Sequence, residues 1–419
     1  MVSFKNIKNN EYIILSLVLA ILPATLILGS AASNTLILFT NFYFIYDIYK
    51  KKKIDFIINK TFFIFIFIWI LLLLNSILIA NNHESFIRSF GFLRFILLIF
   101  IIKYYFENAD ENLKKTVFTV WFITFAVVTI DIFIEFYTGS NILGIKSAYN
   151  GRIASFTGDE LKIGNYYYGF ILLTLSYYYK NYFKNSEIFF YILIIVFIIT
   201  SLLIGERSNF VRTLLMCSFF IVLVDRENFI KKIFVILGIL IITLITILNN
   251  SFYKSRIVDE IIFPIKENGI SNFVKDSRHG SHYELAKNIF KKNYIYGVGI
   301  KNYRNESKKS EYQTYNTLGV YRPDGHSGTS TTHPHQIHYE FLSETGIVGY
   351  IVFIIFFGYS IIFGFKSFFK NKDPFILAST LFIATTALPL IPSGSFFTSF
   401  SASIFWINYS FLLVQAKRF

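Results

Sequence analysis

Cysteine and charged residues are scarce in this sequence. Asp, Glu, Lys and Arg together make up 16% of the 419 residues, whereas 54% are hydrophobic, and the mean hydropathy is +0.52. These values lie outside the usual range of soluble domains and predict a polytopic membrane protein. The single cysteine, Cys217, lies within an apolar segment. An intramolecular disulfide is therefore excluded, and cysteine usage carries no information about the compartment.

A basic soluble region of the kind that binds nucleic acid is also missing from the sequence. The formal net charge is +14 and the pI is about 9.4, but the Lys and Arg residues mostly flank apolar runs. Basic residues in such positions orient membrane helices, so much of the charge reflects topology. We therefore expect no nucleic-acid partner.

Apolar runs long enough to cross a bilayer are abundant. A transmembrane helix needs about 17 to 25 mostly apolar residues to cross a hydrocarbon core of about 30 Å. The candidate segments lie near residues 12–29, 32–48, 61–80, 88–105, 116–136, 166–180, 188–204, 208–224, 229–248, 347–364, 375–392 and 396–415. The predicted fold class is all-α, a polytopic transmembrane bundle of about twelve helices with one large, partly helical loop.

The distribution of Lys and Arg predicts the orientation of the chain. Basic clusters such as residues 50–53 and 366–372 fall in loops on one side, whereas the short loops on the other side carry few basic residues. Because cytoplasmic loops collect Lys and Arg, we expect both termini in the cytoplasm. The chain then divides into helices 1 to 9 (residues 1–248), a long loop on the outer face (249–346) and helices 10 to 12 (347–419).

The outer loop contains a helical pattern. Ser281 followed by Glu284 is typical of a capping box, and the residues after it are apolar at helical spacing. Such a helix either lies on the membrane surface or packs against the transmembrane bundle. Further along, Gly297 and Gly299 indicate tight backbone turns.

Three closely spaced histidines, His333, His335 and His338, precede the next apolar segment. Imidazole is the commonest zinc ligand, so a metal site is one interpretation, although the sequence offers no His-Glu-x-x-His pattern and no cysteine nearby. A second interpretation is a general base, because a histidine accepts a proton near neutral pH. On a helix His335 and His338 would share a face, with His333 in the extended segment before it. At least one of the three has only a structural role, for which His338 is the first candidate.

Arginines near apolar segments are the other chemical signal, because arginine is costly in or near hydrocarbon. Arg207, in a short turn, and Arg278, before the loop helix, are the main candidates for binding a diphosphate through bidentate hydrogen bonds. Alternatively, Arg207 reaches the membrane interface or pairs with Glu206. Arg152 and Arg94 are further candidates for the diphosphate.

Three motifs together resemble the O-antigen ligase and polymerase superfamily of polytopic bacterial glycosyltransferases. They are "GERSNF", "SRHGSHYELAKNIFKKNYIYGVGIKNY" and "HPHQIHYEFLSETGIVGY". The resemblance covers most of residues 200–365, whereas the first half is similar only in hydropathy. It implies that His335 deprotonates the acceptor hydroxyl and that Arg207 and Arg278 hold the diphosphate of an undecaprenyl-linked glycan, with no metal and no cofactor.

The same resemblance marks the residues around His335. Gln336 stands where the family usually has asparagine, so the amide is kept on a longer side chain. We expect Gln336 and His333 to support His335. Glu344, Gly346 and Gly349 follow the family pattern. We expect them to turn the loop helix into the next span.

The resemblance also implies partners and a location. The donor would be an undecaprenyl-diphosphate-linked glycan, and the site would lie at the periplasmic face of the bacterial inner membrane, in contact with membrane lipids. The acceptor would be lipid A-core in a ligase, which the single large loop favours, or another lipid-linked glycan in a polymerase. A transporter for a lipid-linked solute is the alternative from another class, but the sequence lacks the matched halves common in transporters.

Overall fold

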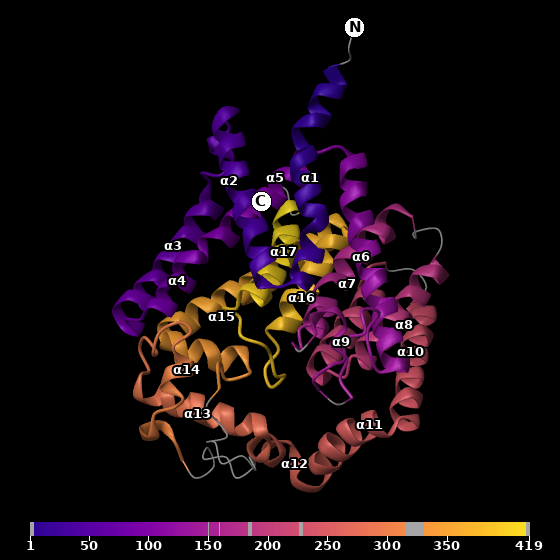
Figure 1. The fold of residues 1–419 in the computed structure, drawn as a ribbon, viewed down its shortest axis with the longest axis vertical. Coiled ribbons are helices and arrows are strands. Elements are labelled where there is room, and N and C mark those ends of the chain that lie inside the picture. The colour runs from indigo at the N-terminus through magenta and orange to yellow at the C-terminus, as the bar shows by residue number, and fades with distance from the viewer. Residues whose placement is uncertain are drawn as a thin grey trace.

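The computed structural model describes residues 4–149, 151–158, 160–182, 187–225, 229–314 and 331–415. For residues 4–11, Asp276, Arg278 and Gln415 it describes only the backbone. All regular structure in these ranges is helical, which confirms the all-α fold class (Figure 1). The α-helices are α1 (Phe4–Leu28), α2 (Ser30–Lys50), α3 (Lys60–Asn75), α4 (His83–Gly91), α5 (Leu93–Asn108), α6 (Glu111–Thr138), α7 (Ile163–Asn181), α8 (Glu187–Leu203), α9 (Arg207–Leu223), α10 (Phe229–Asn249), α11 (Ser251–Lys254), α12 (Phe263–Asp276), α13 (Arg278–Lys292), α14 (Tyr303–Glu306), α15 (Ile337–Asn371), α16 (Pro374–Thr386) and α17 (Ser399–Gln415). The short 3-10 and π-helical turns are η1 (Ile54–Phe56), η2 (Ser76–Ala80), η3 (Ser155–Thr157), η5 (Ser255–Ile262) and η6 (Ser310–Tyr312).

Each predicted apolar run contains a helix, but the count of about twelve membrane spans is not confirmed. Within the described ranges, 5 helical stretches are long and apolar enough to cross a membrane: Lys60–Ala80, His83–Asn108, Glu111–Thr138, Phe229–Asn249 and Ile337–Asn371. Other apolar helices, α8 and α16 among them, are shorter. The run predicted at 375–392 was too long, because α16 ends at Thr386 and the chain continues as a loop through Pro389 and Pro392.

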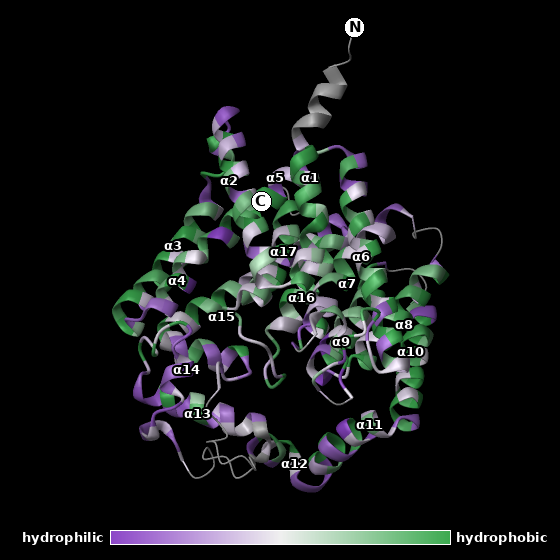
Figure 2. Cartoon of the chain, viewed as in Figure 1, coloured by the Kyte–Doolittle hydropathy of each residue, from purple (hydrophilic) through white to green (hydrophobic). Residues whose placement is uncertain are grey.

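The packing separates a buried centre from an apolar outer surface. At the centre α17 packs against α5 and α16, and α16 also packs against α7, α9 and α15. Nearly every residue of α7 and α16 is buried. Helices α3 and α10 instead carry exposed apolar side chains, which Figure 2 shows as largely hydrophobic outer ribbons. So much exposed apolar surface fits a multi-pass membrane protein, whose outer helices face lipid.

The polar sequence between α10 and α15 forms a helical belt at one end of the bundle. In Figure 1, α11, α12 and α13 cross below the other helices, and the start of α1 and the end of α17 lie toward the opposite end. The predicted capping box is wrong: α13 begins at Arg278, and the Ser277 hydroxyl caps it by accepting from the Gly280 N–H at 3.0 Å. Ser281 therefore lies within the first turns of the helix.

Of the two arrangements considered for the loop helix, the structure has the packed one. Leu285, Ala286 and Ile289 of α13 are buried in a small separate core with residues of the following loop. Tyr283, on the same helix, stacks on Tyr339 of α15 with ring centroids 4.9 Å apart. The belt is thus fixed to α15 by aromatic and aliphatic contacts.

The predicted turn between the loop helix and the next span occurs at Gly346, within α15. Gly346 has φ 64° and breaks the helical path. Gly297, with φ 68°, lies against it so closely that a Cβ there would come within 2.6 Å of the Gly346 nitrogen. The main chain of Val298 and Gly299 donates to the carbonyls of Ser343 and Glu344 at 2.9 and 2.8 Å. Glycine is required at both positions, and the Gly-x-Gly loop braces the segment that follows His335.

Candidate functional site

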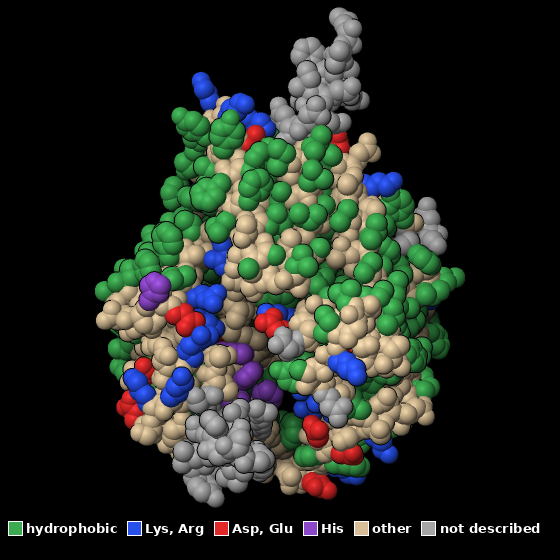
Figure 3. All heavy atoms as spheres, in the orientation of Figure 1, with side chains coloured by type: hydrophobic (Ala, Val, Ile, Leu, Met, Phe, Trp, Pro, Cys, Tyr) green, Lys and Arg blue, Asp and Glu red, His purple; other side chains and the backbone are tan. Residues whose placement is uncertain are grey.

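Four histidines from two separate segments meet at one end of the bundle. The ring centroid of His335 lies 4.1 Å from that of His333, 5.1 Å from His282 and 5.7 Å from His279. His279 and His282 lie three residues apart on α13, and so share a face of that helix. Figure 3 shows histidine side chains gathered on one wall of a hollow in the surface. Of these four, the sequence motif had singled out His333 and His335.

His335 does not lie on a helix as the spacing suggested. The helix α15 begins two residues later, and His335 has a left-handed backbone with φ 57°. Its carbonyl oxygen accepts from the main-chain N–H of Ser393 at 2.7 Å, in the loop between α16 and α17. A left-handed conformation is unfavourable for a residue with a side chain, so tertiary contacts must hold it.

His333 is a half-buried neighbour of His335. Its Nδ1 lies 3.0 Å from the Thr332 hydroxyl. Burial, together with the nearby His335 and Lys301, lowers the pKa of His333 to about 2. That imidazole is therefore uncharged at physiological pH. In the part of the chain that the structure describes, no three His, Cys, Asp or Glu side chains are arranged to hold a metal ion.

Gln336 and His338 have structural contacts. The Gln336 side-chain oxygen caps α15 by accepting from the N–H groups of His338 at 2.7 Å and Tyr339 at 3.2 Å. The ring nitrogens of His338 lie 3.1 Å from the Tyr350 hydroxyl and 2.8 Å from the Ala387 carbonyl oxygen. The structure therefore separates His338 from His335, because the His338 ring packs inside the bundle.

A buried network that the sequence did not predict links the loop before α17 to the start of α15. Lys301, which is 2% exposed, donates through Nζ to the Ser395 hydroxyl at 2.9 Å. Ser395 in turn donates to Glu340, and the Phe396 N–H donates to the same carboxylate at 2.8 Å. The Lys301 main chain also donates to Glu344 at 2.8 Å. These buried hydrogen bonds join the segment of Lys301, the start of α15 and the loop before α17, and so fix both segments that hold His335.

Arg207 belongs to a group of three arginines beside α9. It donates from Nη1 to the Arg256 carbonyl oxygen at 2.6 Å and to Glu260 at 2.8 Å, so its carboxylate partner is Glu260 and not Glu206. Burial, and then the charges of Arg152 and Arg207, lowers the pKa of Arg256 to about 10. The Arg256 guanidinium is therefore close enough to Arg152 and Arg207 to be repelled by both. Arg207 and Arg256 line a small pocket together with Gly205 and Tyr253.

The remaining predicted arginines lie elsewhere. Arg278 is the first residue of α13, next to His279, but its side chain lies outside the described part of the structure. Arg94 lies on α5 and donates to the Gly91 carbonyl and, over 3.0 Å, to the Ser399 hydroxyl. The structure thus brings together Arg152 and Arg207 but places Arg94 in a separate setting.

Arg212 was missed by the sequence interpretation. It lies one and a half turns beyond Arg207 on α9, is 4% exposed, and donates from Nη2 to the Ile391 carbonyl oxygen at 3.2 Å. Residues 391–393 therefore join Arg212 to His335. An arginine within an apolar helix was the available signal, but only the fold shows what it contacts.

The fold and the site define a multi-pass helical membrane protein with a polar site at one end of its bundle. Residues 190–354 of this chain match the family model described as O-antigen ligase. The match includes Arg207, Arg278 and His335, and it confirms the predicted resemblance to the O-antigen ligase and polymerase superfamily. A comparison with curated proteins gives no match.

Proposed function

We propose that this chain is a metal-independent glycosyltransferase that moves a glycan from undecaprenyl diphosphate to an acceptor hydroxyl. The observation that carries the proposal is His335, which is held in a left-handed conformation by Ser393 at the centre of the histidine cluster. The family match over residues 190–354 supports the same reaction class.

In the proposed reaction His335 takes the proton of the acceptor hydroxyl. The acceptor oxygen then forms a bond to the anomeric carbon of the donor sugar, and the bond from that carbon to the diphosphate oxygen breaks. The electron pair of the broken bond leaves with undecaprenyl diphosphate. A general base within hydrogen-bond reach of the hydroxyl typically contributes about 10²- to 10⁴-fold to such a step.

The arginine group beside α9 would neutralise the leaving group. A diphosphate presents several anionic oxygens, which planar guanidiniums bind through paired hydrogen bonds. Arg207 and Arg256 line a common pocket, and Arg152 lies near them. Arg278 begins the helix that carries His279 and His282. We assign these arginines to the donor diphosphate, because fixed cations stabilise charge that develops in the transition state.

The proposal includes a place in the cell and two acceptors. We place residues 249–346 at the periplasmic face of the bacterial inner membrane, with both termini in the cytoplasm, on the basis of the distribution of Lys and Arg. The acceptor is a sugar of lipid A-core in a ligase, or another undecaprenyl-linked glycan in a polymerase. The donor chemistry is the same in both.

The test is a product analysis with the full-length, detergent-solubilised protein, an undecaprenyl-diphosphate-linked glycan and purified lipid A-core, in the presence of EDTA. Glycan on lipid A-core identifies the ligase, and longer chains on the lipid carrier identify the polymerase. Absence of both products, with donor and acceptor intact, contradicts the proposed function.

A further inference from the structure

An apolar cavity of about 380 Å³ lies between α3, α15 and the start of α17. This volume is within the range of natural small-molecule sites. The lining is almost wholly apolar and aromatic, and it includes Asn75, Leu78, Phe92, Tyr296, Val348 and Val352. Leu78, Tyr296 and Val348 are 71%, 55% and 41% exposed. The cavity therefore opens between α3 and α15, within stretches apolar enough to span a membrane.

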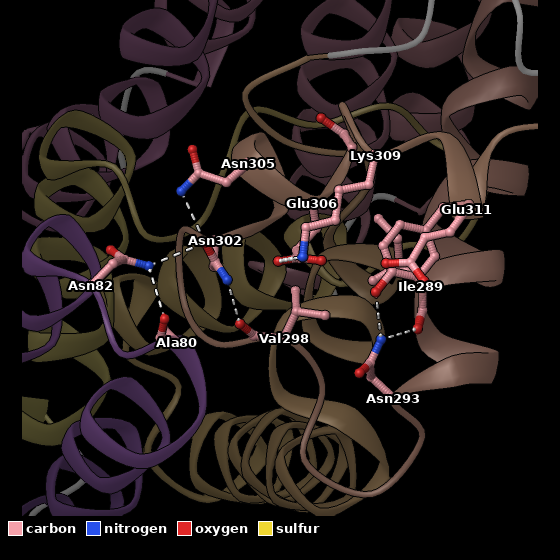
Figure 4. A network of polar contacts seen from close by, with 12 residues as sticks. Ala80, Asn82, Ile289, Asn293, Val298, Asn302, Asn305, Glu306, Lys309 and Glu311 are labelled. Carbon is pink, nitrogen blue, oxygen red and sulfur yellow. Dashed lines mark hydrogen bonds and ion pairs between the residues drawn. The ribbon is translucent and has the colours of Figure 1, made fainter.

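The rim of this cavity belongs to the loop that braces the histidine site. Asn75 donates to the Tyr296 carbonyl at 2.8 Å and accepts from the Ile300 N–H at 3.1 Å. Figure 4 shows Asn82 donating to Asn302, so that the same loop is also tied to the turn between α3 and α4. A molecule in the cavity would thus lie beside the segment that carries Lys301.

Two arginines that have no carboxylate partner among the described residues flank Phe92, which lines the cavity. Arg88 and Arg94 both donate to the Ser399 hydroxyl, over 3.2 and 3.0 Å. Among the described residues neither forms an ion pair with Asp or Glu, and the Nε of Arg94 is buried without a hydrogen-bond partner there. Phe92, between them in sequence, lines the cavity. Two adjacent guanidiniums next to hydrocarbon are costly, and a bound anion with two or more charges would offset that cost.

We infer that the cavity binds the isoprenyl chain, and Arg88 and Arg94 the diphosphate, of a second lipid-linked glycan that serves as acceptor. This inference rests on the proposed function and names its acceptor class. The donor arginines lie beside α9, and Figure 1 places α9 and α15 on different sides of the bundle. The acceptor hydroxyl belongs to the glycan and not to the diphosphate, so the two diphosphates need not share a site.

Charge and shape both favour this occupant over other lipids. A diphosphate matches two guanidiniums, whereas phosphatidylglycerol carries a single phosphate. The cavity between α3 and α15 suits a single isoprenyl chain, whereas lipid A carries several acyl chains. The inference therefore favours the polymerase over the ligase.

The test uses the full-length protein in lipid nanodiscs and an isoprenyl diphosphate that carries a diazirine on its terminal isoprene unit. After photolysis, labelled peptides are identified by mass spectrometry. We expect labels on α3 and α15 in the wild type. Val352→Trp fills the cavity, and labelling of α3 and α15 should fall at least about tenfold, the loss expected when two or more methylene groups are displaced from apolar surroundings.

Matched variants separate this site from the donor site. Ile355→Trp places the same side chain on an exposed face of α15, at a residue that is 64% exposed, and should leave the labelling unchanged. Arg88→Gln with Arg94→Gln should reduce labels on α3 and α15, whereas Arg207→Gln should not. A diazirine-bearing phosphatidylglycerol that labels the cavity as efficiently as the diphosphate would overturn the assignment to an isoprenyl diphosphate.

Two results would overturn the lipid site itself. They are an absence of labels on α3 and α15 in the wild type, and labelling that Val352→Trp and the double arginine variant both leave intact. If the wild type transfers no glycan yet shows the expected labels, the proposed function fails and the lipid site stands. If glycan transfer is observed and the labels are absent, the lipid site fails alone.

Discussion

The main-chain N–H of Ser393 donates to the carbonyl oxygen of His335 over 2.7 Å, which ties the proposed base to the loop between α16 and α17. His335 has a left-handed backbone, and such a conformation costs of order 1 to 3 kcal/mol in a residue with a side chain. The loop contributes to overcoming that cost. Groups that fix residues 391–395 should therefore affect catalysis without touching substrate.

Arg212 is the first such group. Arg212→Met removes the donor that holds the Ile391 carbonyl, and hydrogen bonds to charged groups contribute about 1.5 to 3 kcal/mol. We expect kcat to fall about tenfold or more while the Kd for the donor stays unchanged. Val211→Met, at a more exposed neighbouring position, is the control. A rise in the donor Kd with unchanged kcat would show instead that Arg212 binds the donor.

Arg207 and Glu260 form an ion pair that would compete with a diphosphate. Arg207→Gln should weaken donor binding, and Arg207→Lys should restore only part of it, because lysine lacks the planar fork of donors. Glu260→Gln should strengthen donor binding, since it releases Arg207 and removes a negative charge from the pocket. Equilibrium binding of the donor measures all three. Weaker binding by Glu260→Gln would mean that the carboxylate positions Arg207 for the donor.

Gln336 caps α15 through its side-chain oxygen, and asparagine is an effective cap as well. Gln336→Asn should therefore keep transfer activity close to that of the wild type. Gln336→Leu loses the cap and should destabilise the protein by about 1 kcal/mol, with a fall in activity. Thermal unfolding and transfer are measured on both variants. Loss of activity in Gln336→Asn at unchanged stability would assign the Gln336 amide a direct role at the site.

Glu206 should make stability depend on pH. Burial raises the pKa of Glu206 from its ordinary value of 4.5 to about 7, although hydrogen bonds from Asn209 and Gly164 and the nearby Arg152 act in the opposite direction. Between these two values the folded state retains a proton that the unfolded state has released. Stability therefore falls as the pH rises from about 4.5 to 7 and then levels off.

Glu206→Gln removes this dependence. The apparent Tm of the wild type, relative to that of Glu206→Gln, should be lower at about pH 8 than at about pH 5. Scans at one fixed heating rate give the comparison. An equal difference between the two proteins at both pH values would contradict the assigned pKa.

Local patterns in the sequence predicted the parts of this molecule that local physics determines. Apolar runs located the helices, and Gly297 and Gly299 marked real turns, because both features depend on neighbouring residues alone. The end of α16 was misplaced, since hydropathy does not register that Pro389 and Pro392 stop a helix. The start of α13 was misplaced because Ser277 and Ser281 offer equivalent caps.

The composition of the site depends on contacts between distant segments. In the sequence Lys301 resembles an ordinary solvent-exposed lysine of a loop. In the structure it is buried and donates to the Ser395 hydroxyl. His279 and His282 lie more than fifty residues before His335 and meet it only because α13 packs against α15. The spacing of residues along the sequence does not predict a contact between segments so far apart. The resemblance selected His335, and the fold supplies the neighbours that hold it.

The most direct test of the account replaces the proposed base. His335→Asn and His335→Ala are compared with the wild type and with His338→Asn in single-turnover transfer assays, in EDTA, with donor binding measured separately. The account predicts that both His335 variants transfer glycan at least about 100-fold more slowly while binding the donor as the wild type does. His338→Asn should lower the apparent Tm and leave the transfer rate close to that of the wild type. Transfer by His335→Ala at the wild-type rate would contradict the assignment of His335 as the base.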